Sequence, residues 1–168
     1  VCSSDLYRVQ KIIAFSEREA LVATRRDGVY VLDYQTMRLK RLFSGSNNIL
    51  QGAYLSSNGY IYLSFWGQGL FCYEKTGKFI KRYTKENSDL TNNYVLDIVE
   101  KEGFLWLATD GGGINRLELS NENFSNLYHI AGDKNSLPVN SVTILYKDEN
   151  EGLWAGSVRG GVFNIKES

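Results

Sequence analysis

The stretch Leu105-Trp-Leu-Ala-Thr-Asp-Gly-Gly-Gly113-Ile114 decides the fold, because related stretches occur three more times in the chain. Each copy begins with apolar residues, crosses a polar or glycine-rich turn and resumes with Gly followed by Val, Leu or Ile. The other copies cover 20–29, 61–70 and 153–162. The shared glycines are 41, 44 and 48 residues apart, at Gly28, Gly69, Gly113 and Gly161. A period in the forties with an all-β pattern predicts a β-propeller whose blades have four short strands each.

The third repeat shows the expected strands most clearly. We expect an inner strand at 94–99, then strands at 104–109, 114–119 and 124–130, separated by turns rich in Gly, Asn and Glu. A glycine precedes the second strand in three repeats, and we expect it to supply a positive φ to the hairpin turn; these are Gly59, Gly103 and Gly152. Arg18 stands there in the first repeat, so that turn must differ.

The repeat divides the chain into four expected blades. Their ranges are 7–48, 49–92, 93–139 and 140–168, and the last range is too short for an outer strand. A propeller closes its ring only when every blade is complete. We therefore expect an open fragment of a larger propeller.

Residues 1–6, Val-Cys-Ser-Ser-Asp-Leu, share nothing with the repeat. They can be back-translated into the end of a common sequencing adapter, so we interpret them as an adapter or cloning scar and exclude them from the fold. A genuine terminal tail is the alternative interpretation. Without Cys2 only Cys72 remains, and the cysteines then predict neither a disulfide nor a compartment.

Charge and composition exclude several classes of function. The chain has 19 basic and 19 acidic residues, so no overall electrostatic attraction draws it to nucleic acid or to an anionic membrane. No apolar run approaches the roughly 20 residues of a membrane span. The single histidine, His129, and the cysteines form no metal-binding spacing, and we expect neither a metal nor a cofactor.

Repeats three and four resemble the regulator-propeller repeat of bacterial hybrid two-component systems, which is common in gut Bacteroidetes. The resemblance rests on an asparagine before the inner strand, an acidic-Gly turn, Leu-Trp, Thr-Asp-Gly-Gly-Gly and Asn-Arg, as at 93–117. Residues 88–93 and 135–140 resemble the Ser-Leu-x-x-Asn link between such blades. The first two repeats depart from the pattern, with Leu21 and Tyr62 at the tryptophan position and Phe65-Trp66 in place of Thr-Asp.

The resemblance implies a function that composition does not show. Family members carry propellers of about seven blades in a periplasmic sensor region, followed by a membrane helix and cytoplasmic kinase and DNA-binding parts. It implies that this segment is a non-catalytic, periplasmic module that senses glycan breakdown products and controls polysaccharide utilisation. It also implies a membrane-anchored, homodimeric parent protein, with an oligosaccharide as the possible ligand and no nucleic-acid contact by this segment.

Ligand-binding candidates come from the turns between second and third strands and from the links between blades, which share one face of a propeller. Aromatic faces stack on sugars, and polar side chains hydrogen-bond sugar hydroxyls. Trp66 is the best single candidate because it departs from its own repeat. The other candidates are Gln68, Arg25, Asp27, Asp110, Arg159, Asn93 and Asn140. The alternative is that such residues serve the turns themselves.

Trp106 and Trp154 have a different expected role. They occupy one strand position, which Tyr62 and Leu21 share, and this recurrence predicts packing between blades rather than sugar stacking.

Two alternatives to a ligand sensor remain open: a propeller enzyme such as a lyase or glycosidase, and a pure protein-interaction propeller. A glycosidase needs paired acids, and Asp27 and Asp110 fall in corresponding turns two blades apart. Single acids in repeated turns support catalysis only weakly, and His129 lacks an evident partner, so we expect no catalytic residue in this segment.

Overall fold

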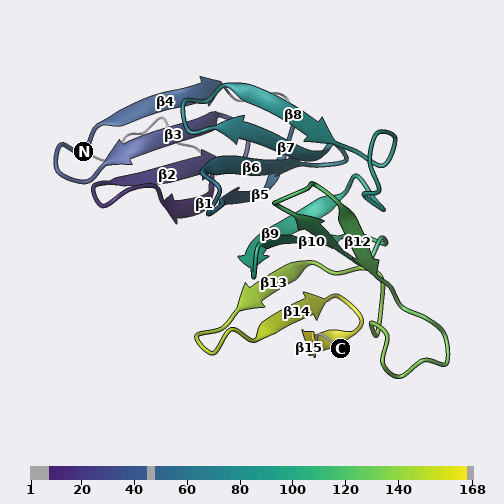
Figure 1. Ribbon diagram of the computed structural model, residues 1–168. Coiled ribbons are helices and arrows are strands. Elements are labelled where there is room, and N and C mark those ends of the chain that lie inside the picture. Colours follow the sequence, from purple (N-terminus) through teal and green to yellow (C-terminus); the bar gives the residue numbers. More distant parts are fainter. Residues whose placement is uncertain (1–7, 45–47, 166–168) are drawn as a thin grey trace.

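A computed structural model describes residues 8–44 and 48–165, so the expected scar at 1–6 lies outside the described residues. The described residues form fifteen strands and no helix. The strands pair in sequence order into three four-stranded sheets and one three-stranded sheet, and neighbouring strands are antiparallel throughout (Figure 1). The prediction of consecutive four-stranded meanders is confirmed.

The first sheet contains β1 (Val9–Ala14), β2 (Glu19–Thr24), β3 (Gly28–Asp33) and β4 (Leu39–Ser44). The second contains β5 (Leu50–Leu55), β6 (Tyr60–Phe65), β7 (Gly69–Glu74) and β8 (Phe79–Tyr83). The third contains β9 (Val95–Lys101), β10 (Phe104–Thr109), β11 (Ile114–Glu118) and β12 (Phe124–Leu127). The fourth contains β13 (Ile144–Lys147), β14 (Leu153–Ser157) and β15 (Gly161–Ile165).

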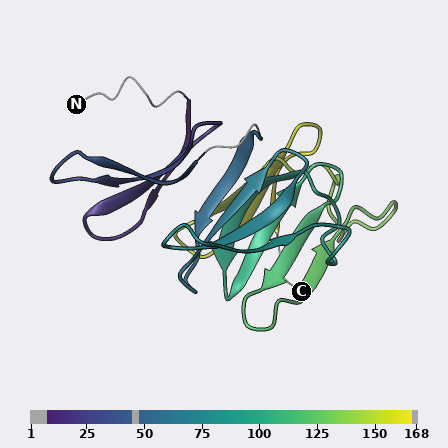
Figure 2. The same cartoon turned by 90° about the horizontal axis from the view of Figure 1, so that it is seen from above.

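The sheets are arranged as propeller blades. The first strand of each sheet contacts the first strand of the next, so that β1 lies by β5, β5 by β9 and β9 by β13. Figure 2 shows the same sheets from above, with the first sheet at one end of the arrangement. Each sheet therefore has an inner strand, and the last strand of its meander lies at the outer side.

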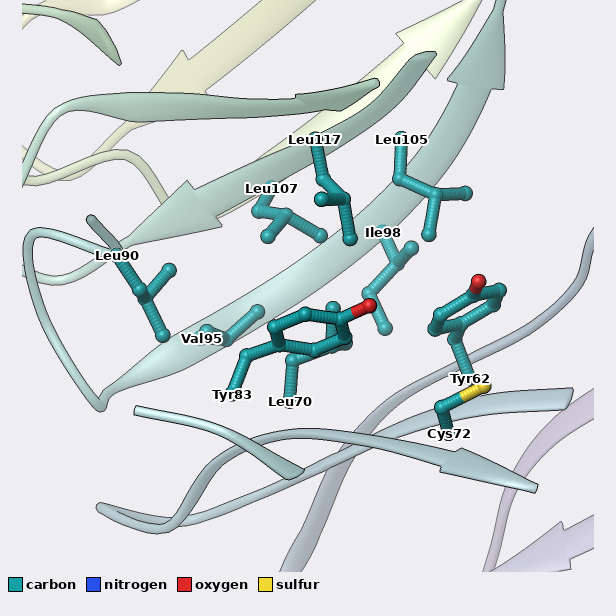
Figure 3. Packing of buried hydrophobic residues seen from close by; sticks show 10 residues of the cluster. All are labelled: Tyr62, Leu70, Cys72, Tyr83, Leu90, Val95, Ile98, Leu105, Leu107 and Leu117. Atoms are coloured by element: carbon teal, nitrogen blue, oxygen red, sulfur yellow. The ribbon is translucent and has the colours of Figure 1, made fainter. Parts of the chain in front are cut away.

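The core lies between consecutive sheets, because successive side chains of a strand point to opposite faces of its sheet. In β10, Leu105 and Leu107 pack towards the second sheet, whereas Trp106 and Ala108 pack towards the fourth, and all four are fully buried. Figure 3 shows the cluster between the second and third sheets, where Leu70 and Tyr83 meet these leucines. Burying one leucine side chain contributes about 2 kcal/mol.

Glycine has two distinct uses in the turns. Glu102 and Gly103 both have positive φ, at 52° and 80°, which is the backbone of a type I′ hairpin turn. Gly113 also has a positive φ, and a Cβ atom there would lie 2.1 Å from the Leu127 carbonyl oxygen. Only glycine lets β12 approach so closely.

The expectation that Gly152 supplies a positive φ is wrong. The left-handed residue of that turn is Glu151, with φ 62°. Gly152 is needed for space instead, because a Cβ atom there would lie 2.4 Å from Asp148 Oδ2. The Asp148 carboxylate fills the hairpin: Oδ1 accepts from the backbone N–H groups of Asn150 and Gly152, and Oδ2 accepts from Trp154 Nε1 at 2.7 Å.

Trp154, which we expect to pack between blades, is partly exposed among the described residues. Trp106 is 0% exposed because the fourth sheet covers it, whereas Trp154 is 39% exposed. Tyr146 and Val162 lie on the same face of the fourth sheet and are 61% and 77% exposed. The same strand position is thus buried or open according to whether another sheet lies against it.

Acid should weaken the hairpin that Asp148 holds together. The Trp154 indole N–H, and then the Gly152 amide, lower the pKa of Asp148 below its ordinary value. A lowered folded-state pKa means that the carboxylate stabilises the fold above its unfolded pKa, and that this contribution is lost as the pH falls through the folded value. We expect Asp148→Asn to lower the Tm at pH 7, and we expect its difference from the wild type to shrink as the pH falls below the unfolded pKa of the carboxyl, as thermal unfolding followed by circular dichroism will show.

Glu149→Gln is the matched control, because Glu149 is an exposed neighbouring carboxylate outside this hydrogen-bond set. A Tm gap between wild type and Asp148→Asn that stays constant across the acid range would contradict the assignment.

Candidate functional site

The turns between second and third strands and the links between sheets meet at one end of the molecule. The backbone N–H of Gly69 donates to the Asn93 carbonyl, and that of Gly113 donates to the Asn140 carbonyl, each at 2.8 Å. The Trp66 N–H likewise donates to the Ile49 carbonyl at 2.8 Å. The links are therefore held against the turns of the sheets that they join, which is the arrangement expected for the ligand-binding face.

An exposed aromatic pair stands on this face. Trp66, in the turn after β6, is 47% exposed, and Tyr94, just before β9, is 39% exposed. Their ring centroids are 5.1 Å apart, and the ring planes lie at 77°. Tyr94 was not among the sequence candidates, since it had been assigned to the inner strand. The signal that could have found it is its position directly after the link residue Asn93.

Gln68 lies beside this pair and is already engaged. Arg82 donates from Nε to the Gln68 backbone carbonyl at 2.6 Å and from a terminal nitrogen to the Gln68 side-chain oxygen at 3.0 Å. The guanidinium also lies over the Phe71 ring, 5.0 Å from its centroid. A ligand could still use the remaining lone pairs and the side-chain amide N–H groups of Gln68.

Three other candidates make bonds that shape the links. Asn93 Oδ1 accepts from the Lys85 backbone N–H, and Asn140 Oδ1 accepts from the His129 backbone N–H. Asp110 accepts a hydrogen bond from the Ser141 hydroxyl. These contacts agree with the alternative that the polar residues serve the turns, because each side chain satisfies a group of the adjoining link.

The remaining candidates come from the first and fourth sheets. Arg25 lines a small hollow beside Phe43 and Phe65, Asp27 lies in the same turn, and Arg159 lies in the turn before β15. Among the described residues, no hydrogen bond or ion pair occupies the side chains of Arg25, Asp27 or Arg159. The structure therefore places the candidates along this face, with at least one on each sheet, and Gln68 shares a turn with Trp66.

Acid-base and metal chemistry have little support at this face. Residues 8–44 and 48–165 contain no group of three or more His, Cys, Asp or Glu side chains placed to hold a metal ion. His129 Nδ1 lies 2.7 Å from the Leu137 carbonyl oxygen, so the imidazole is tied to a link. Burial raises the pKa of the Cys72 thiol, which keeps it protonated. None of the helices that a membrane span would require occurs in the described part of the chain.

The third repeat of the chain matches a known family model. Residues 89–111, which include the link, β9 and β10, match the family model described as "Two component regulator propeller". No curated protein sequence matches the chain.

Solved structures with the same fold include extracellular domains of signalling proteins from B. thetaiotaomicron. The chain is similar to those assigned to the hybrid two component systems BT3049 (TM-score 0.74, 16% identity) and BT4673 (TM-score 0.71, 18% identity). Both comparisons include 100% of this chain, but only 24% of the BT3049 chain and 26% of the BT4673 chain. This chain therefore spans about a quarter of the length of either one.

The computationally designed protein Ika4 is also similar, with a TM-score of 0.65 and 13% identity over 98% of this chain and 94% of that chain. At these identities the similarities establish the fold alone, and they confirm the expected propeller architecture. The expected resemblance is confirmed over residues 89–111, where the third repeat matches the two component regulator propeller model, and the fold is of the propeller type.

Proposed function

We propose that this chain is a segment of the extracellular sensor propeller of a hybrid two-component system, and that it binds an oligosaccharide at the face of Trp66 and Tyr94. The matched repeat and the fold shared with extracellular domains of such systems support the signalling role. The exposed aromatic pair is the observation that carries the ligand class.

The geometry of the pair suits a carbohydrate. Two rings at a steep angle offer a flat face and an edge, and the apolar face of a pyranose can stack on one while its hydroxyls remain free. Gln68 lies in the same turn as Trp66 and offers a side-chain amide there, whereas the Asn93 side chain is bonded to Lys85 and Glu86. A site of this kind binds and releases a sugar without chemistry, as a sensor requires.

The proposal extends to the whole protein from which such a segment would come. In that protein the propeller lies in the periplasm, ligand binding outside alters a homodimer anchored in the membrane, and a cytoplasmic kinase passes the signal on. Glycan breakdown products are the proposed signal, and the segment itself contacts no nucleic acid.

Replacing Trp66 by Ala should weaken oligosaccharide binding about 30-fold. A centrally placed tryptophan contributes about 2 kcal/mol to binding, and 1.4 kcal/mol corresponds to a tenfold change in Kd. Isothermal titration calorimetry against neutral oligosaccharides of three to six units measures the effect, and Tyr94→Ala should act in the same direction. Tyr34→Ala is the control, because Tyr34 is 48% exposed but lies in the turn between β3 and β4, at the other end of the sheet.

Two results would favour the other function classes. Cleavage of a bound saccharide by the purified chain would indicate a propeller enzyme. If Trp66→Ala and Tyr94→Ala both leave saccharide binding unchanged, the sugar does not bind at this face. That result would favour a protein-interaction role for the face.

A further inference from the structure

A cavity of about 200 Å³ lies between the second and third sheets, towards the end opposite the Trp66 face. Its wall includes β6, β7 and β8 from one sheet, and the end of β11 with the following turn from the other. Neither of the other two clusters between sheets contains a tyrosine or cysteine among its fully buried members. The interface between the second and third sheets combines an apolar cluster with buried hydroxyl and thiol groups, contributed by Tyr62, Tyr83 and Cys72.

The two buried tyrosines give the cavity polar groups. Tyr62 is 4% exposed and Tyr83 is 7% exposed, and Figure 3 shows both rings in the cluster, with Cys72 beside Tyr62. The Tyr62 hydroxyl accepts from Asn58 Nδ2 at 3.1 Å. Burial raises the pKa of both phenols, so both keep their protons and act as donors. Tyr62 also interacts with the Cys72 thiol, and Tyr83 interacts with the Glu122 carboxylate. A polar guest in the cavity can exchange hydrogen bonds with these groups.

The rim of the cavity carries charges of both signs. Lys81 forms an ion pair with Glu122, which joins β8 to the turn after β11, and its ammonium lies 5.4 Å from the Tyr83 ring centroid. Glu118 accepts from Ser120 and Asn121, and these hydrogen bonds lower its pKa, so it is a carboxylate at neutral pH. One cation and two carboxylates disfavour an anionic guest while offering donors and acceptors to a neutral one.

The size of the cavity limits the guest. A water molecule takes about 30 Å³ of liquid volume, so 200 Å³ holds about six waters or one compact ring with its hydroxyl groups. A second hollow of about 430 Å³ adjoins the cavity, since Asn58, Glu118 and Leu119 line both. That wider groove gives a guest a route from solvent.

We propose that this cavity binds a neutral polyhydroxylated molecule of monosaccharide size. The phenols of Tyr62 and Tyr83 donate to its hydroxyl oxygens, Glu118 and Glu122 accept from its hydroxyl hydrogens, and Tyr60 covers one face of the ring at the rim. The site is separate from the Trp66 face and does not depend on the function proposed there.

Isothermal titration calorimetry with D-glucose, D-galactose and D-mannose, and with D-glucuronate as the anionic probe, tests the proposal on the whole chain. We expect saturable binding of at least one neutral sugar with a Kd of about 1 mM or tighter, and at least tenfold weaker binding of glucuronate. Tyr83→Phe removes one donor and should weaken binding about tenfold, whereas Tyr73→Phe, outside the cavity lining, should not change it.

Trp66→Ala separates this site from the proposed sensor face, since it should leave monosaccharide binding intact. Should Tyr83→Phe fail to fold, Tyr60→Ala at the 37% exposed rim position provides the second variant, with an expected fivefold or greater loss. Absence of binding for all three neutral sugars, glucuronate binding as tight as theirs, or equal loss in Tyr73→Phe would each overturn the proposal. A loss in Trp66→Ala equal to that in Tyr83→Phe would also overturn it and assign the sugar to the other face.

Discussion

Asp97→Ala should lower the free energy of unfolding by about 3–4 kcal/mol, because this carboxylate joins three sheets. Asp97 is 6% exposed. Oδ1 accepts from Lys11 Nζ at 2.8 Å and from the Ile98 backbone N–H at 3.0 Å, and Oδ2 accepts from the Leu145 backbone N–H at 2.9 Å. Alanine leaves a buried N–H of β13 unsatisfied and a lysine of β1 unpaired.

The two parts of this loss can be separated. The Lys11 side chain is 37% exposed, so solvent screens the ion pair, and Lys11→Met should cost only about 1 kcal/mol. Asp97→Asn keeps an acceptor for one backbone N–H and should fall between wild type and Asp97→Ala. Urea unfolding of the single variants and of the double variant gives the coupling energy. An Asp97→Ala loss below about 0.5 kcal/mol, the size of an ordinary surface substitution, would show that the carboxylate does not hold the sheets together.

Trp106→Ala should be the most destabilising single truncation, at about 4 kcal/mol. Its indole is fully buried between the third and fourth sheets, among Leu145, Leu153 and Ala155. The Arg116 guanidinium lies 5.0 Å from its ring centroid on the same face of the sheet. Alanine would leave a cavity among these side chains, and a cavity that the surroundings fill only in part adds to the cost of the lost burial.

Trp154→Ala is the matched control for that variant, because Trp154 holds the same strand position in the next repeat. It is 39% exposed, and its truncation should cost about 1 kcal/mol, mainly through partial burial and the bond to Asp148. Trp106→Phe should be tolerated far better than alanine, because Nε1 of Trp106 is buried without a hydrogen-bond partner among the described residues. Equal losses for Trp106→Ala and Trp154→Ala in urea unfolding would contradict the packing assigned to Trp106.

Local sequence patterns predicted the strands well where the repeat conforms to its pattern. The expected strand at 104–109 has the same bounds as β10, because a continuous apolar run with a glycine-containing turn on either side marks a strand that is buried on both faces. The outer strand expected at 124–130 ends at Leu127, since residues 128–130 instead enter the link and bond to it, as the Leu137 N–H does to the Tyr128 carbonyl. The conformation of a link depends on the sheet that it packs against, so the hydrophobic periodicity of the sequence does not predict where the strand ends and the link begins.

The candidate site was predicted less completely for a related reason. Trp66 could be found because it departs from its repeat, but Tyr94 resembles the first residue of a strand. Asn93 and Asn140 resemble ligand contacts in sequence, yet their oxygens are taken by backbone N–H groups eight and eleven residues earlier in the chain. The folded links decide which polar side chains already have hydrogen-bond partners and which are free to bind a ligand.

The sequence by itself determined the number of sheets, their meander order and the two apolar faces of each sheet, because these follow from a repeat of short alternating strands and glycine turns. Tertiary structure alone decided which equivalent positions are covered. Trp106 and Trp154 share one local pattern, but only Trp106 has a sheet against it. The ion pair of Lys11 and Asp97, 86 residues apart, and the cavity beside Tyr62 and Tyr83 likewise exist only because separate sheets pack together, and burial is a property of that packing rather than of the local chain.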